Sequence, residues 1–194
     1  MTKLSMNYPA KRFHVTILII GLFLFIPLYT YILWLLKSMD IDFIEFTKVW
    51  ISFDIDRFQE FFYQIAKQGN RQTLIFCYYL NIASVIGYMF IFYSLTLMIA
   101  RKISPGSRLH MVSLIFPVIV LVVAFLDLLS NFTLIIALSH LEKMSQWHIS
   151  IISSTYVCRL LLFCLVISWI VVSAVLSTFH KTRGRFSCLD MTQY

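Results

Sequence analysis

The fold of this chain is decided by the run VIVLVVAFLDLLSNFTLIIAL, which extends from Val118 to Leu138. It is long and apolar enough to cross a bilayer, since a membrane-spanning helix needs about 20 predominantly apolar residues. Near its middle the run carries Asp127 and Asn131, which share one helix face because they are four residues apart. A carboxylate at bilayer depth is costly unless it is paired, protonated or hydrated. The run therefore predicts a membrane helix whose polar face is turned toward neighbouring helices.

The composition of the whole chain points to the same class of protein. Of its 194 residues, 60% are hydrophobic and 13% are charged, against about 25% charged in a soluble domain. Apolar runs of membrane-spanning length occur at about 13–36, 74–99, 111–138 and 149–176. The sequence therefore predicts an all-α membrane protein in which residues 1–194 form a single bundle of four transmembrane helices.

The segment 37–72 separates the first two apolar runs. It carries apolar residues with the spacing of one helix face, namely Phe58, Phe61, Phe62 and Ile65. Asp54 or Asp56 can cap the start of such a helix, and Gly69 can end it. We expect an amphipathic helix that lies on the bundle or at the lipid interface. A lid over the site described below is the alternative.

The distribution of basic residues predicts how the chain crosses the membrane. The N-terminal tail, the 101–108 turn and the C-terminal tail hold nine Lys and Arg, whereas the 139–148 connection holds one. Basic residues favour the cytoplasmic side, so both termini are expected there and the 37–72 segment outside. The net charge of +7 then reflects a basic rim beside anionic lipid headgroups. Membrane lipids are thus the expected partners, and nothing calls for a nucleic acid.

Polar residues of the four runs fall close to one depth when each helix is measured at about 1.5 Å per residue. The layer contains Tyr29, Asn81, Asn131 and Arg159, with Asp127 one turn deeper and level with Ser84. Because an arginine side chain can bridge one turn, we expect Arg159 to pair with Asp127. Such a layer predicts either interhelical hydrogen bonding alone or an outward-opening pocket for a ligand.

Part of the chain resembles a known pattern. Gly69-Asn70-Arg71, then Asn81 and Tyr88, then Asp127-Leu-Leu-Ser130-Asn131 are similar to small bacterial four-span membrane proteins of unassigned function. Those proteins have a G-x-R segment, an Asp and a Tyr in the second span and D-x-x-E-N in the third. The resemblance covers about 56–138 and implies a bacterial inner (plasma) membrane. Asn81 and Ser130 stand where the pattern has carboxylates, so chemistry that needs those groups would be lost here.

The remaining cysteine, histidine and serine residues do not indicate a cofactor. The four cysteines, Cys77, Cys158, Cys164 and Cys188, contain no C-x-x-C pair, which disfavours a zinc ribbon or a thiol oxidoreductase of that type. His140, Glu142 and His148 flank one connection without a recognised metal-site spacing. The serines of the fourth run lack a histidine at their depth, so a hydrolase triad is not supported. We therefore expect no metal and no cofactor.

Three functions remain open from the sequence. The first is a polar pocket for a small amphiphile or ion, formed by the layer together with Tyr88. The second is a membrane enzyme that acts on a lipid or isoprenoid, with Asp127 as general acid or base. The third is a structural subunit of a membrane complex, whose polar layer only pairs helices. A homo- or hetero-oligomer is compatible with all three.

Overall fold

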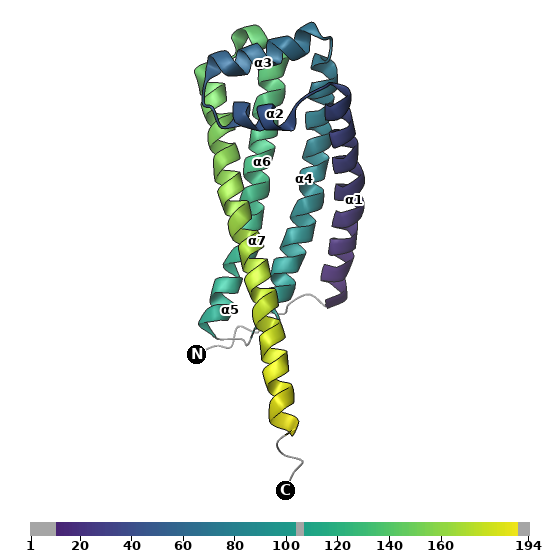
Figure 1. Ribbon diagram of the computed structural model, residues 1–194, viewed down its shortest axis with the longest axis vertical. Coiled ribbons are helices and arrows are strands. Elements are labelled where there is room, and N and C mark those ends of the chain that lie inside the picture. Colours follow the sequence, from purple (N-terminus) through teal and green to yellow (C-terminus); the bar gives the residue numbers. More distant parts are fainter. Residues whose placement is uncertain (1–10, 104–106, 190–194) are drawn as a thin grey trace.

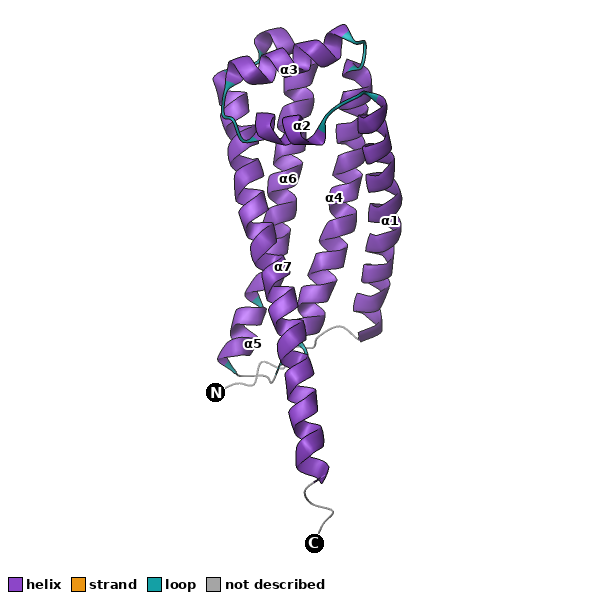
Figure 2. Ribbon diagram, viewed as in Figure 1, coloured by secondary structure: helices purple, strands orange, loops and turns teal. Residues whose placement is uncertain are grey.

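The computed structural model describes residues 11–103 and 107–189, and it is built from helices (Figures 1 and 2). The four long ones are α1 (Lys11–Ser38), α4 (Arg71–Ala100), α6 (Ile115–Ser139) and α7 (Gln146–Leu189). The short ones are α2 (Phe43–Trp50), α3 (Ile55–Lys67), α5 (Arg108–Ser113) and the 3-10 turn η1 (Leu141–Lys143). The described ranges contain no strand, which confirms the all-α prediction.

Four stretches have the length and hydropathy of membrane spans. They are Arg12–Ser38, Arg71–Ala100, Arg108–Ser139 and Gln146–Val175. The protein is thus an integral membrane protein with four spans. In Figure 1, α2, α3 and η1 lie at one end of the long helices, whereas α5 and the start of α1 lie at the other.

The long helices pack in a row rather than in a closed ring. α1 packs along α4, α4 along α6, and α6 along α7, whereas α1 and α7 do not pack along each other in the described part of the chain. α2 packs against α7 and crosses the space between these two flanking helices near one end (Figure 1). The bundle is therefore open on the side between α1 and α7.

Two of the expected spans lie on helices whose bounds differ from those of the span. The span expected at 111–138 is broken at Leu114, where α5 ends and α6 begins. Pro117 explains the break, because it has no N–H to donate to the carbonyl of Ser113 and is tolerated in a first helical turn. The fourth helix continues from the expected end at 176 to Leu189, since no proline follows Leu176. The membrane span carried by this helix ends at Val175, close to the expected end at 176.

The amphipathic helix expected in the 37–72 segment is confirmed as α3. Oδ1 of Asp54 caps it by accepting from the N–H groups of Asp56 and Arg57, at 3.0 and 3.4 Å. Gly69 follows its end with φ +78°, a conformation that glycine adopts without strain. Its buried side chains, Phe58, Phe62 and Ile65, belong to a core cluster shared with α4, α6 and α7.

Two contacts fix the helices that carry the polar layer. A Cβ added to Gly21 of α1 would lie 2.7 Å from the carbonyl oxygen of Gly87 of α4, so these backbones touch directly. At the start of α4, Nε of Arg71 donates to the carbonyl of Leu138 at 2.7 Å, and its Nη2 donates to that of Ser139. Arg71 therefore satisfies carbonyls that the end of α6 leaves without helical partners.

The basic N-terminal tail up to residue 10 and the Pro105-Gly106 breaker lie outside the described residues, as do the side chains of the basic residues at 181–185.

Candidate functional site

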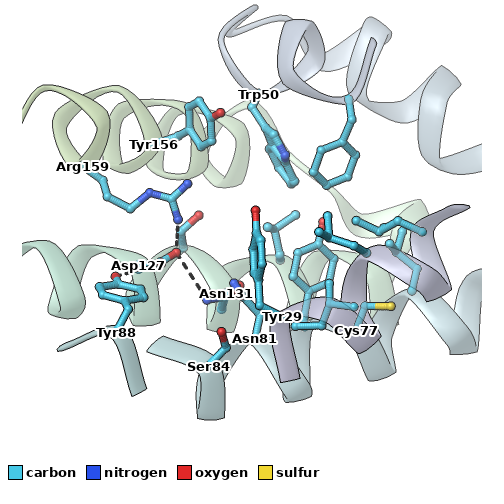
Figure 3. Close-up of a pocket in the computed structure, with 18 of the residues that line it drawn as sticks. Tyr29, Trp50, Cys77, Asn81, Ser84, Tyr88, Asp127, Asn131, Tyr156 and Arg159 are labelled. Carbon is cyan, nitrogen blue, oxygen red and sulfur yellow. Dashed lines mark hydrogen bonds and ion pairs between the residues drawn. The ribbon is translucent and has the colours of Figure 1, made fainter. Parts of the chain in front are cut away.

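A cavity of about 240 Å³ lies between the helices on the open side of the bundle (Figure 3). α1 and α7 form its two flanks, α4 and α6 its floor, and α2 its roof at one end. Its lining includes every site residue predicted from the sequence: Tyr29, Asn81, Ser84, Tyr88, Asp127, Asn131 and Arg159.

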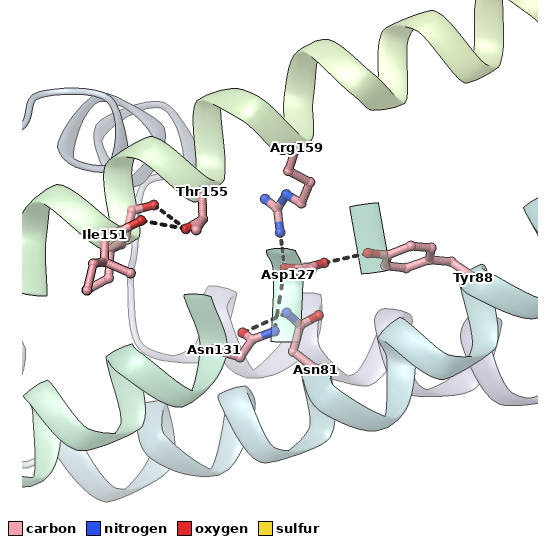
Figure 4. Close-up of polar contacts among 8 residues, drawn as sticks. Asn81, Tyr88, Asp127, Asn131, Ile151, Thr155 and Arg159 are labelled. Atoms are coloured by element: carbon pink, nitrogen blue, oxygen red, sulfur yellow. Dashed lines mark hydrogen bonds and ion pairs between the residues drawn. The ribbon is translucent and has the colours of Figure 1, made fainter. Parts of the chain in front are cut away.

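Asp127 is the centre of a hydrogen-bond network in this cavity (Figure 4). It lies in the middle of α6 and is 5% exposed. Nη1 of Arg159 forms an ion pair with its Oδ1, which confirms the expected pairing of α6 with α7. The hydroxyl of Tyr88 donates to Oδ2 at 3.0 Å, and Nδ2 of Asn131 donates to Oδ1 at 3.5 Å. Both carboxylate oxygens are therefore already engaged.

The network continues to α4 through the two asparagines. Nδ2 of Asn81 donates to Oδ1 of Asn131 at 3.0 Å, so the amide of Asn131 links Asn81 to Asp127. Asn131 is fully enclosed by the protein, at 2% exposed. The Asn131-Phe-Thr133 glycosylation pattern therefore lies on a buried residue within a membrane helix.

Two hydroxyls in the wall have no hydrogen-bond partner among the described residues. They belong to Tyr78 and Ser84, which are 7% and 1% exposed. Tyr78, Asn81, Ser84 and Tyr88 follow one another at intervals of three or four residues, so they form a single stripe on the cavity face of α4. The same spacing rule, extended back from Asn81, would have found Tyr78 in the sequence.

Arg159 stands at the edge of the cavity, with a side chain that is 26% exposed. Its guanidinium carbon lies 4.9 Å from the ring centroid of Tyr156, within the range of a cation–π contact. Within the described ranges, hydrogen bonding of this guanidinium is limited to Nη1. Nε and Nη2 therefore remain as donors beside the cavity.

The aromatic roof was missed from the sequence. Trp50 and Phe46 of α2 line the cavity, and the ring of Trp50 stacks near that of Tyr156 at a centroid distance of 6.4 Å. The i, i+4 spacing of Phe46 and Trp50 was the available signal, and Tyr156 precedes Arg159 by three residues. The amphipathic helix α3 contributes nothing to the lining, so the element that covers the site is α2.

Tyr29 occupies the predicted depth but does not join the network. It lines the cavity, is 39% exposed, and stacks on Phe25 at a centroid distance of 5.1 Å. The part of the chain that the structure describes gives its hydroxyl no hydrogen bond. In the structure, the predicted layer is thus a hydrogen-bonded network that runs from Asn81 through Asn131 and Asp127 to Arg159. Tyr88 belongs to this network, and Tyr29 does not.

Polarity changes along the cavity. The charged pair, Tyr88 and Ser84 lie toward its deep end, near the middle of the long helices. The end beneath α2 is mainly apolar, being lined by Ile32, Leu33, Leu36, Phe46, Trp50, Leu74 and Leu134 together with Thr47 of α2. From Leu74 to Ser84 the helix rises about 15 Å, which gives the scale of this gradient.

No group of three metal-ligating side chains lies together in the described ranges. His148 instead has Nδ1 2.8 Å from the Oγ of Ser145, at the start of α7.

Comparison with known proteins gives this geometry no relative. No family model matches the chain, and neither a curated protein nor a solved structure matches it. The resemblance to small bacterial four-span proteins accordingly stays a prediction.

Proposed function

We propose that this protein binds a small amphiphile in the cavity between α1 and α7. The proposal rests on the side chains that line this cavity. Aromatic and aliphatic side chains form most of its wall, and a hydrogen-bonded polar cluster closes one end. Binding sites for small molecules typically combine apolar walls with a few fixed polar groups.

The open side of the bundle supports access from the lipid phase. α1 and α7 flank the cavity without packing along each other. Leu33 and Tyr29 on one flank, and Arg159 on the other, are partly exposed there. Part of an amphiphile can therefore lie between the flanking helices while its polar group reaches the network.

The geometry favours binding over acid–base catalysis. A general base must take a proton from the substrate, whereas three donors, from Arg159, Tyr88 and Asn131, already compete for the carboxylate of Asp127. An inorganic cation is also disfavoured, because the guanidinium of Arg159 occupies the side of the carboxylate that such an ion would need.

A purely structural role for the polar cluster is the remaining alternative. It would leave the cavity without an occupant and Nε and Nη2 of Arg159 without an acceptor at membrane depth. Unpaired donors are costly in hydrocarbon, and this cost favours a ligand.

The basic-residue bias supports a topology with both termini in the cytoplasm, and the bacterial inner membrane is the membrane that the resemblance implies. In that orientation α2 and α3 lie at the outer face, and the apolar end of the cavity lies closest to it.

Native mass spectrometry of the detergent-purified protein tests the proposal. We expect a co-purified amphiphile on the wild-type protein and its loss from Leu33→Trp, which fills the cavity from α1. Leu24→Trp is the matched control, because Leu24 is a partly exposed leucine on the same helix outside the lining. Equal retention by both variants, or no retained molecule on the wild-type protein, would contradict the proposal.

A further inference from the structure

We infer that the ligand is held in an inverted orientation. Its polar group is an uncharged hydrogen-bond acceptor, such as a ketone or ester carbonyl, placed at Arg159 near the middle of the membrane. Its apolar part lies toward the outer end, beneath α2. The inference rests on the proposed function and adds the chemical class of the ligand and its direction in the cavity.

The direction follows from the polarity gradient. A lipid of the outer leaflet has its polar group at the membrane surface and its chain toward the centre. The cavity has the opposite arrangement, with Asp127 at the centre of α6 and with Leu36 and Leu74 near the α2 end. A ligand that matches polar to polar and apolar to apolar must therefore point its polar group inward.

The acceptor character follows from the donors that the cluster leaves unused. Arg159 has Nε and Nη2 available beside the cavity. The hydroxyls of Tyr78 and Ser84 are buried in its wall without partners among the described residues. The oxygens of Asp127, by contrast, already accept from Arg159, Tyr88 and Asn131. An incoming group therefore meets unused donors, whereas the carboxylate of Asp127 already accepts three hydrogen bonds.

The absence of charge follows from the balance at the site. Asp127 and Arg159 neutralise each other, so the cluster has no net charge to compensate an anion. An anionic group at Arg159 would also lie beside the Asp127 carboxylate. A charged group near the bilayer centre carries an additional desolvation cost, which a ketone or ester largely avoids.

Fluorescence quenching of Trp50 tests both parts of the inference, because this residue lies at the apolar end of the cavity. A protein in which Trp50 is the sole tryptophan is made by Trp34→Phe, Trp147→Phe and Trp169→Phe and placed in nanodiscs. The probes are methyl decanoate brominated at mid-chain, the matching ionised decanoate well above the pKa of its carboxyl group, and a brominated decane. Trp50→Phe, which keeps the other three tryptophans, is the control for nonspecific quenching.

We expect saturable quenching by the ester at about tenfold lower concentration than by either of the other probes. The hydrocarbon lacks the hydrogen bond to the site, and the ionised acid would bring a charge into it. Tighter binding of the ionised acid would overturn the uncharged headgroup while leaving an amphiphile site intact. The absence of saturable quenching by all three probes would count against the proposed function itself.

The orientation is read from the bromine position in the ester. With the apolar part under α2, mid-chain bromines should quench Trp50 at least as strongly as bromines next to the carbonyl. Quenching by the carbonyl-adjacent probe alone would place the chain toward the other end of the helices and overturn the inverted orientation.

Discussion

Nη1 of Arg159 on α7 pairs with Oδ1 of Asp127 on α6 at the edge of the cavity, and the two partners are unequally buried. The Asp127 side chain is 7% exposed and the Arg159 side chain 26%. The carboxylate therefore depends on its protein partners, whereas the guanidinium can also reach the cavity. Because of this difference in burial, removing the charge of Arg159 and removing the charge of Asp127 should lower the stability by different amounts.

Arg159→Gln is expected to lower the free energy of unfolding by about 3–5 kcal/mol, because it leaves a buried carboxylate without its countercharge. Asp127→Asn should cost less, because the remaining guanidinium is partly exposed. The double variant should recover much of the loss. Thermal unfolding of the four proteins in one detergent measures the cycle, and strictly additive losses would contradict the ion pair.

Tyr88→Phe removes the hydroxyl that donates to Oδ2 of Asp127 but keeps the ring. A hydrogen bond to a charged group contributes about 1.5–3 kcal/mol, so we expect a measurable fall in thermal stability. Tyr79→Phe is the matched control, since Tyr79 is 56% exposed on the same helix. If both variants unfold at the same temperature, Tyr88 does not stabilise the carboxylate.

The membrane helices and the polar cluster were predictable because both depend on local rules. Apolar runs of sufficient length must satisfy their backbone groups internally, which requires helices. Asp127, Asn131 and Arg159 would each be costly in hydrocarbon, so the sequence alone indicates that they meet. The depth estimate also placed Asn81 level with Asn131 and Ser84 level with Asp127.

The rest depended on how helices far apart in sequence come together. The row order that leaves α1 and α7 apart is set by contacts such as Gly21 with Gly87, which no single helix reveals. The roof formed by Trp50 depends on the path of the chain between α1 and α3. Tyr29 lines the cavity but forms no hydrogen bond with the network among the described residues, because depth alone does not give the direction of a side chain.

Gly87→Ala is expected to destabilise the α1–α4 contact. A Cβ at this position would lie 2.8 Å from the backbone nitrogen of Phe25, which cannot move independently of α1. Overpacking of this kind costs about 1–3 kcal/mol. Ser94→Ala is the control, since it makes a fully buried position on the same helix smaller. Equal thermal stability of wild type and Gly87→Ala would show that the helices are not in direct contact there.

Arg71→Gln should loosen the end of α6, because the shorter amide cannot reproduce both hydrogen bonds to Leu138 and Ser139. We expect a loss of about 1–3 kcal/mol and faster amide hydrogen exchange around residues 138–143. Arg57→Gln, at an exposed position of α3, should change neither measurement. If amide hydrogen exchange around residues 138–143 is the same in Arg71→Gln as in the wild type, Arg71 does not have this role.

The proposed orientation of the chain is tested by labelling single cysteines in intact cells with a membrane-impermeant maleimide. Gln68 and Lys102 are exposed and lie at opposite ends of α4, so Gln68→Cys and Lys102→Cys are introduced after the native cysteines are replaced by alanine. Because basic residues cluster at the end that contains Lys102, we expect labelling of Gln68→Cys alone. Both should react after the cells are permeabilised, which controls for buried thiols.

Labelling of Lys102→Cys but not Gln68→Cys in intact cells would reverse the orientation. The apolar end of the cavity would then lie closest to the cytoplasmic face, and an inverted ligand would have to come from the inner leaflet.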